Sequence, residues 1–226
     1  MQRNRERRTT SVELKGLAGL ALLVGTLCTF FAVAAATHYG GFETVDRAVL
    51  LSLRTPQDLR DPIGPPWFES FVRDVTALGG RGVLGLVVIA VTGVLALNGH
   101  GARALAILIY VSTGSLVVEL AKLFFARARP DVVPHAVDVA SLSFPSGHAM
   151  QASVVYLTLA ALFARTQPDR RVRAYVFGLA AIVVLMVGAS RVYLGVHWPS
   201  DVLAGWALGI AWASGCWLLD QRLGRR

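Results

Sequence analysis

The chain carries six apolar stretches, each close to the ~20 residues that an α-helix needs to cross a lipid bilayer. With 54% hydrophobic residues and a mean hydropathy of +0.55, the sequence is too apolar for an ordinary soluble domain. The stretches are 16–37, 82–98, 103–125, 147–165, 174–190 and 199–219. The second and fifth are short, which a compact bundle in a locally thinned bilayer tolerates. We therefore predict an all-α integral membrane protein, a bundle of six transmembrane helices that forms a single domain over residues 1–226.

The first apolar stretch has a second interpretation. It follows a basic segment, residues 1–15, and it ends in three alanines at 34–36, as a secretory signal peptide with a small-residue cleavage site would. A signal peptide has an apolar core of only ~7–15 residues, and this stretch is about twice as long. Its length favours an uncleaved membrane helix, with residues 1–15 as a short tail before it.

The distribution of positive charge predicts which way the helices run. If the N-terminus is cytoplasmic, the inner segments are 1–15, 98–103, 165–173 and 220–226, and these hold thirteen of the 22 Lys and Arg but only four acids. Short cytoplasmic loops of membrane proteins carry such an excess of Lys and Arg. We therefore expect both termini in the cytoplasm of a cell with a bacterial-type inner membrane. The net charge of +8 needs no nucleic-acid partner, because these cations can face anionic lipid.

Residues 38–81 form the long loop on the opposite, external side. Residues 42–54 have helical apolar spacing, residues 67–78 could form another short helix, and the proline-rich segment 61–66 separates the two. We expect a cap of amphipathic helices on the membrane surface. Trp67, Phe68 and Phe71 would suit the interface, where they could also border a lateral entrance for a lipid headgroup.

Polar residues suited to phosphate chemistry recur at the ends of the later stretches, on the predicted external face. Three groups appear in order, namely Lys122 with Arg129-Pro130, then Pro145-Ser146-Gly147-His148, then Ser190-Arg191 with His197 and Asp201. Cations at a membrane edge are costly unless something anionic is held there. A tetrahedral oxyanion such as phosphate would use the three cations for its charge, and the two histidines could attack it and donate a proton.

The second group has the form of a helix start. Pro145 precedes Ser146, Gly147 and His148, which would lie in a first turn whose free N–H groups and dipole attract an anion. The absence of a side chain at Gly147 would let a phosphate approach the backbone closely. An ordinary Ser/Pro helix start would explain the first two residues but not a histidine at the membrane edge.

His197 and Asp201 are four residues apart, which on a helix places them on one face. The carboxylate could then accept a hydrogen bond from one imidazole nitrogen, fix the tautomer and leave the other nitrogen free to attack phosphorus. Pro199 lies between them and could distort this arrangement.

The three groups together resemble the motifs KxxxxxxRP, PSGH and SRxxxxxHxxxD of the type 2 phosphatidic acid phosphatase (PAP2) superfamily, which includes lipid phosphatases, soluble acid phosphatases and vanadium haloperoxidases. Every motif position is present within residues 122–201. The resemblance implies a PAP2/haloperoxidase-like helical core with His197 as nucleophile, Asp201 as its partner and His148 as the acid that protonates the leaving oxygen. The phosphate-binding residues that it implies are Lys122, Arg129, Ser146, Gly147 and Arg191. The implied reaction passes through a phosphohistidine and needs no metal or other cofactor.

Glu119 lies one turn before Lys122 in an otherwise apolar stretch. A carboxylate inside a membrane span is a functional candidate, and we expect it to pair with Lys122 in support of the site. The sequence contains no CxxC or HExxH pattern, so it offers no support for a metal site.

These observations favour a phosphatase that removes phosphate from a membrane lipid at the outer face of the inner membrane. Candidate substrates are undecaprenyl diphosphate, phosphatidylglycerol phosphate and phosphatidic acid. A lipid phosphotransferase with the same histidine nucleophile is the main alternative, because transfer and hydrolysis would use the same residues. A haloperoxidase fits less well, since six spans indicate a lipid substrate, and a non-catalytic binding or transport protein fits poorly with intact histidines. The oligomeric state stays open.

Overall fold

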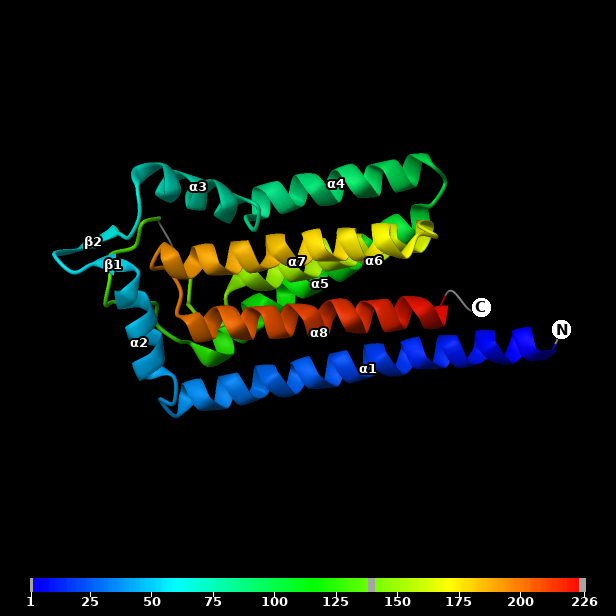
Figure 1. Cartoon of the computed structure of the whole chain (residues 1–226), viewed down its shortest axis with the longest axis horizontal. Helices are drawn as coiled ribbons and strands as arrows, with labels where there is room; N and C mark the ends of the chain where they lie inside the picture. Colours follow the sequence, from blue (N-terminus) through cyan, green and yellow to red (C-terminus); the bar gives the residue numbers. More distant parts are fainter. Residues whose placement is uncertain (1, 138–140, 224–226) are drawn as a thin grey trace.

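The computed structural model describes residues 2–137 and 141–223 and is predominantly helical. The helices are α1 (Gln2–His38), α2 (Glu43–Ser52), α3 (Pro66–Ala77), α4 (Arg81–Leu97), α5 (Gly101–Phe125), α6 (Gly147–Thr166), α7 (Arg170–Tyr193) and α8 (Pro199–Leu223). The strands β1 (Arg54–Thr55) and β2 (Asp58–Pro62) pair antiparallel. This small hairpin is a minor addition to the predicted all-α fold, because the long helices define the architecture (Figure 1).

Five helices are long and apolar enough to cross a membrane: α1 over Gly16–His38, and α5, α6, α7 and α8. The second predicted span, 82–98, corresponds to α4 and passes the test only as part of a bent pair of helices. α4 has only 17 residues, and it passes the same test together with α3, from which it is turned by 48°. The fifth span is longer than predicted, because α7 includes the arginines at its start and the polar turn at its end. The long helices lie side by side as a bundle, which confirms the predicted transmembrane fold (Figure 1).

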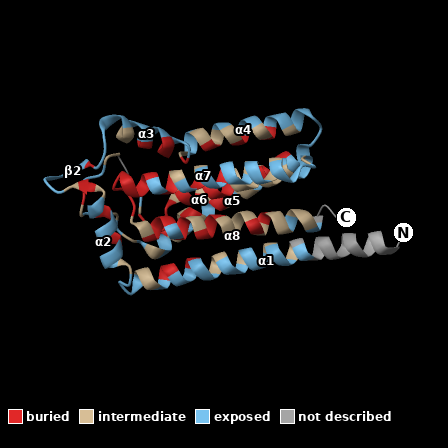
Figure 2. Cartoon of the chain, viewed as in Figure 1, coloured by how far each residue is buried: buried red, intermediate tan, exposed pale blue. Residues whose placement is uncertain are grey.

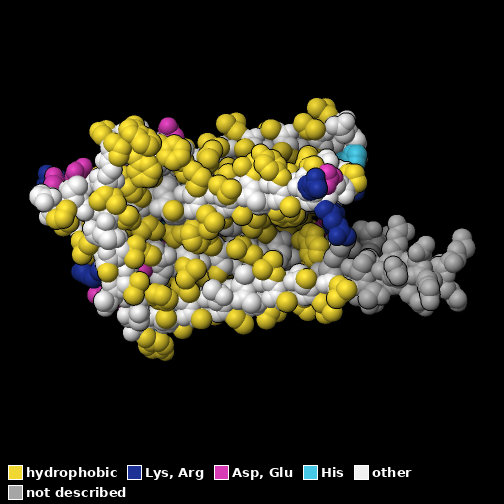
Figure 3. Space-filling view, viewed as in Figure 1, with side chains coloured by type: hydrophobic (Ala, Val, Ile, Leu, Met, Phe, Trp, Pro, Cys, Tyr) yellow, Lys and Arg dark blue, Asp and Glu magenta, His cyan; other side chains and the backbone are white. Residues whose placement is uncertain are grey.

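The surface of the bundle matches a lipid environment. Large apolar side chains on the long helices are exposed, among them Leu86, Ile89, Leu116, Phe124 and Ile182. Apolar side chains cover the middle of the visible face, while charged ones gather at its two ends (Figure 3). A soluble protein would not leave so much apolar surface in water, so the exposed apolar belt is the surface that faces lipid.

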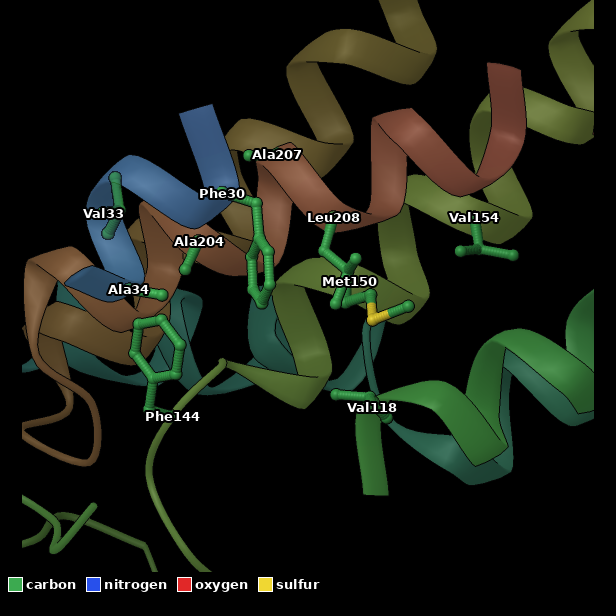
Figure 4. Close-up of a cluster of buried hydrophobic side chains, with 10 residues drawn as sticks. All are labelled: Phe30, Val33, Ala34, Val118, Phe144, Met150, Val154, Ala204, Ala207 and Leu208. Atoms are coloured by element: carbon green, nitrogen blue, oxygen red, sulfur yellow. The ribbon is translucent and has the colours of Figure 1, made fainter. Parts of the chain in front are cut away.

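The largest buried cluster joins α1 to the part of the bundle that carries the polar motifs. Its members are Phe30, Val33, Ala34, Val118, Phe144, Met150, Val154, Ala204, Ala207 and Leu208 (Figure 4). Phe30 of α1 packs near Phe144, with 6.0 Å between the ring centroids, in the segment that leads into α6. Removal of α1 would therefore expose the core beside the second motif.

Two glycines on α8 let α6 come close. A Cβ at Gly205 would lie 2.6 Å from the Ser146 carbonyl oxygen, and one at Gly209 would lie 2.6 Å from the Cβ of Ser153. The spacing of four residues is the small-xxx-small pattern of tightly packed membrane helices. This contact places the N-terminal end of α6 directly against the first turns of α8, so that the second and third motifs meet.

The predicted cap is present at one end of the bundle. α2, the hairpin and α3 lie at the end where α5 and α7 finish and where α6 and α8 begin (Figure 1). α3 packs on α7 and buries Val72, Val75 and Thr76. The buried residues of α6, α7 and α8 are also concentrated toward this end (Figure 2). The two cap helices that the sequence predicts, 42–54 and 67–78, are thus confirmed as α2 and α3.

Candidate active site

His197 and Asp201 meet at the junction between α7 and α8. Nδ1 of His197 lies 3.4 Å from Oδ2 of Asp201, and both side chains are almost completely buried. Pro199 begins α8 and does not prevent the contact, because proline is accommodated in the first turn of a helix. The backbone N–H of Trp198 also donates to Oδ2, at 3.0 Å. The carboxylate is therefore held by the turn that carries the histidine.

Ser143 contacts both members of the His197–Asp201 pair, and the sequence motifs did not predict a role for this residue. Its hydroxyl donates to Oδ2 of Asp201 at 2.5 Å and lies 3.3 Å from Nδ1 of His197. On the other side of the ring, Arg129 donates from Nη1 toward Nε2 at 3.3 Å. Nε2 is thus an acceptor, so the proton of the neutral imidazole is placed on Nδ1. Burial lowers the pKa of His197 to about 4, against the opposing effect of Asp201.

His197 lines a cavity of about 400 Å³. The residues that line this cavity are Thr76, Arg81, Val118, Glu119, Lys122, Arg129, Val137, Ser141, Gly147, His148, Gln151, Arg191 and His197. They come from α3, α4, α5, α6, α7, the long loop between α5 and α6, and the short loop between α7 and α8. All three predicted cations and both predicted histidines therefore face one space.

The three predicted cations that line this cavity are held by neutral oxygens. Lys122 donates from Nζ to the Ser141 hydroxyl at 2.8 Å, and Arg129 donates from Nε to the Ser141 carbonyl at 2.6 Å. Arg191 donates from Nη1 to the Thr76 hydroxyl at 2.9 Å. In the part of the chain that the structure describes, none of the three forms an ion pair. Their positive charge has no directly paired carboxylate, which suits an anionic ligand.

Two buried polar atoms near the cavity strengthen this conclusion. The hydroxyl of Ser146, which is the N-cap residue of α6, and Nε of Arg191 have no hydrogen-bond partner among the described residues. Buried polar atoms are normally paired, because an unpaired one costs about 1–3 kcal/mol. Gly147 and His148 follow in the first turn of α6 and line the cavity. An oxyanion bound there would supply acceptors for the serine, the arginine and the free N–H groups of the helix start.

A second buried network lies behind Asp201, and the sequence analysis did not find it. Arg127 donates from Nη1 to Oδ1 of Asp201 at 2.6 Å and from Nη2 to Oδ2 of Asp46 at 2.9 Å. Ser200 links the same groups, since its hydroxyl donates to Asp46 at 2.5 Å and accepts from Arg127 at 2.8 Å. Asp46 belongs to α2, so the cap helix is connected to the His197–Asp201 pair. The sequence contains one indication that Asp46 is buried, because this residue shares a helix face with the apolar Leu50 four residues later.

The expected partnership between Glu119 and Lys122 is wrong. Oε1 of Glu119 lies 2.6 Å from Nη2 of Arg81, at the start of α4, while Lys122 turns to Ser141. One turn of helix separates Glu119 from Lys122, but α4 lies beside α5 and offers the closer cation.

The cap aromatics border a different space. Trp67, Phe68 and Phe71 line an apolar groove of about 780 Å³ between α3, α7 and α8. Among the described residues, this groove shares no lining residue with the cavity at His197.

The chain matches the family model of the PAP2 superfamily over residues 103–225. It is 33% identical over 183 residues to phosphatidylglycerophosphatase B of Bacillus subtilis, a match that covers 80% of this chain and 86% of the relative. It is also 44% identical over 72 residues to an undecaprenyl-diphosphatase of Sulfolobus acidocaldarius, which covers 32% of this chain and 30% of that protein. A crystal structure of a transmembrane PAP2-type phosphatidylglycerolphosphate phosphatase from Bacillus subtilis superimposes with a TM-score of 0.82 at 28% identity, covering 90% of this chain and 98% of the other. On both sequence and fold, the chain belongs to the PAP2 superfamily.

Proposed function

We propose that this protein hydrolyses a lipid phosphate or diphosphate through a phosphohistidine at His197. Its family and its relatives make it a PAP2-type membrane phosphatase that acts on lipid phosphates or diphosphates. One observation carries the finer mechanism. His197, whose Nδ1 faces Asp201, lines a cavity that also contains three cations without an ion-pair partner among the described residues.

In the first step, Lys122, Arg129 and Arg191 hold the oxygens of the phosphate, and Nε2 of His197 attacks phosphorus. Asp201 accepts the hydrogen bond from Nδ1 and stabilises the positive charge that develops on the ring. His148 donates a proton to the leaving oxygen as the P–O bond breaks. The three cations take up the charge of the transition state, which is the main catalytic requirement of phosphoryl transfer.

In the second step, water attacks the phosphohistidine. His148, now unprotonated, takes the proton from this water as the P–N bond breaks and its electron pair returns to the imidazole. Inorganic phosphate is released and both histidines regain their starting protonation states. His148 lies in the wall of the same cavity as His197, which supports this double role.

A lateral opening supports a lipid substrate. An apolar cleft of about 460 Å³ lies between α4 and α5, and it is lined largely by aliphatic residues such as Leu84, Val88, Ile89 and Leu116. It shares residues with the phosphate cavity, so a lipid could place its phosphate beside His197 while its chain stays in the bilayer. Phosphatidylglycerol phosphate, undecaprenyl diphosphate and phosphatidic acid all have the required form.

We place the site on the external face of a bacterial-type inner membrane, with both termini in the cytoplasm and residues 1–226 forming one domain. The cavity lies at the end of the bundle that carries the cap, and the excess of Lys and Arg lies in the loops at the other end. The positive-inside rule then puts the cavity outside.

The test is phosphate release by the purified protein in detergent from a panel of lipid phosphates, with EDTA present. We expect release without added metal, no release by His197→Ala, and full activity in His38→Ala, which changes an exposed histidine outside the cavity. Activity that needs Mg²⁺ would contradict the charge-neutralising role of the cations. Phosphate that appears on a second lipid instead of in solution would identify a phosphotransferase.

A further inference from the structure

Three polar residues lie where the phosphate cavity meets the apolar cleft. Arg81 of α4, Glu119 of α5 and Gln151 of α6 are the residues that line both spaces. We call these three residues the collar. Any lipid that reaches His197 from the cleft would thread through the collar, so the collar contacts whatever group follows the phosphate that is transferred.

The hydrogen bonds within the collar leave the guanidinium of Arg81 available to a ligand. Gln151 is engaged with Ser115, at 2.8 and 3.0 Å. Arg81 uses Nη2 for Glu119 at 2.6 Å, and its side chain remains 80% exposed. A guanidinium has five N–H donors in a planar fork, so Arg81 can keep the contact with Glu119 and still present further donors to an anion.

This inference rests on the proposed function and narrows its substrate class. Lys122, Arg129 and Arg191 are assigned to the transferred phosphate, which leaves Arg81 as the cation at the next position along the substrate. A lipid with one phosphate presents a neutral ester group there. A lipid diphosphate presents a second phosphate, which stays on the product and needs a cation once it has left water.

We propose that Arg81 binds the retained phosphate of a lipid that carries two phosphates, and that Glu119 holds the guanidinium in place when the collar is empty. The binding site of this enzyme thus has two parts, one for the phosphate that is removed and one for the phosphate that remains. The preferred substrates are then diphosphates, or lipids with a phosphodiester close behind the terminal phosphate, over phosphatidic acid.

The test compares farnesyl diphosphate with farnesyl monophosphate, which share one chain and differ in the retained phosphate. For Arg81→Gln we expect the ratio of kcat/KM for diphosphate to kcat/KM for monophosphate to fall about 10- to 100-fold, as for the loss of a charge-assisted hydrogen bond. Arg81→Lys should recover part of the ratio. Arg60→Gln, which changes an exposed arginine of β2, should leave it unaltered.

Glu119→Gln separates the two members of the ion pair, because it keeps the cation and removes its partner. We expect this variant to retain the preference for diphosphate. The proposed second phosphate site would be wrong if Arg81→Gln lowered kcat/KM equally for both substrates, or if Glu119→Gln also lost the preference for diphosphate. The ion pair would then only maintain the structure of the opening. Failure of the unaltered protein to release phosphate from either substrate would instead overturn the proposed function itself.

Discussion

Arg127 joins Asp201 to a second carboxylate, because its two terminal nitrogens lie 2.6 Å from Oδ1 of Asp201 and 2.9 Å from Oδ2 of Asp46. The guanidinium occupies one oxygen of Asp201 and leaves Oδ2 to face His197. Asp46 and Asp201 are both buried, so two acids share one cation. We infer that Arg127 positions Asp201, and through it the imidazole, without touching the substrate.

Replacement of Arg127 should therefore lower kcat more than it raises KM. For Arg127→Met we expect kcat to fall about 10- to 100-fold, the effect of losing a charge-assisted hydrogen bond to the orienting acid. The variant should also unfold more easily, by about 3–5 kcal/mol, because two buried carboxylates lose their cation. Steady-state kinetics and thermal unfolding in detergent measure the two effects.

The double variant Arg127→Met/Asp46→Asn separates positioning from stability. It removes one of the uncompensated charges, so part of the stability should return while kcat stays low. Arg73→Met is the matched control, since it breaks an exposed ion pair with Glu69 on α3. Recovery of kcat together with stability would show that Arg127 acts only as a structural cation.

Most of the fold could be predicted from the sequence because a bilayer leaves few choices. Stretches of about 20 apolar residues must form helices, since lipid offers no partner for backbone polar groups. The exceptions are α4, which is too short by itself, and the hairpin. A break of three residues, 78–80, turns α3 from α4. At Gly79 the backbone lies so close to Val187 of α7 that a Cβ would overlap it, so the break requires glycine at this position. Such a fit between distant residues cannot be read from local periodicity.

The sequence predicts which residues line the cavity better than it predicts the residues that support them. His148, His197 and the three cations follow from their types and their places at helix ends. The partners of Asp201 do not, because Ser143 and Arg127 lie in an irregular loop whose path depends on the whole bundle. The pairing of Glu119 with Arg81 was missed for a similar reason. Spacing along one helix says nothing about a neighbouring helix.

Replacement of His148 and replacement of His197 should have different effects on the amount of phosphoenzyme that is trapped when the reaction is stopped in acid-free denaturant. His197→Ala should form no phosphoenzyme and should release no phosphate. His148→Ala lacks the proton donor and the base, but a diphosphate has a good leaving group, so the first step should still proceed slowly while hydrolysis stalls. Phosphoenzyme from a terminally ³²P-labelled lipid diphosphate should then accumulate in His148→Ala above the level in the unaltered protein. Labelled protein in His197→Ala would assign the nucleophile to another residue.

The pH dependence follows from the buried state of His197. Burial lowers its pKa to about 4, from an ordinary value of 6.5, so the neutral imidazole that the proposed mechanism requires persists well into the acid range. Protonation removes it only as the pH falls through about 4, and activity should be lost there. Because kcat/KM also reports the ionisation of the substrate, two lipid phosphates of different pKa must be compared. An acid limb near pH 6.5 common to both would contradict the prediction.

Close packing of α6 on α8 should make Gly205 sensitive to a single methyl group. A Cβ at this position would lie 2.6 Å from the Ser146 carbonyl and 3.0 Å from the Cβ of Ala149. We expect Gly205→Ala to destabilise the protein by about 1–3 kcal/mol and to lower kcat, because the start of α6 would move. Gly178→Ala on α7, where a Cβ meets nothing within 4 Å, is the control. Equal unfolding temperatures for the two variants would show that the helices adjust without cost.

The orientation of the bundle can be tested with single cysteines, because the loops at its two ends should lie on opposite sides of the membrane. Cys28 and Cys216, both free thiols, are first replaced by alanine. Asp131→Cys then reports the end with the cavity, and Thr166→Cys reports the end with the excess of arginine; both positions are exposed. We expect a membrane-impermeant maleimide to label position 131 in intact cells and position 166 only after the membrane is broken.

The labelling pattern also decides which lipids the enzyme can meet. If position 131 is accessible from outside, His197 opens toward the outer leaflet, and the substrate is a lipid whose phosphate is presented there, such as an outward-facing carrier diphosphate. The reverse pattern would place thirteen Lys and Arg on the outside, against the positive-inside rule. It would move the reaction to cytoplasmic lipids and exclude a role in recycling an outward-facing carrier. The phosphatase chemistry would stand in either orientation, because it depends on the cavity and not on the side of the membrane that it faces.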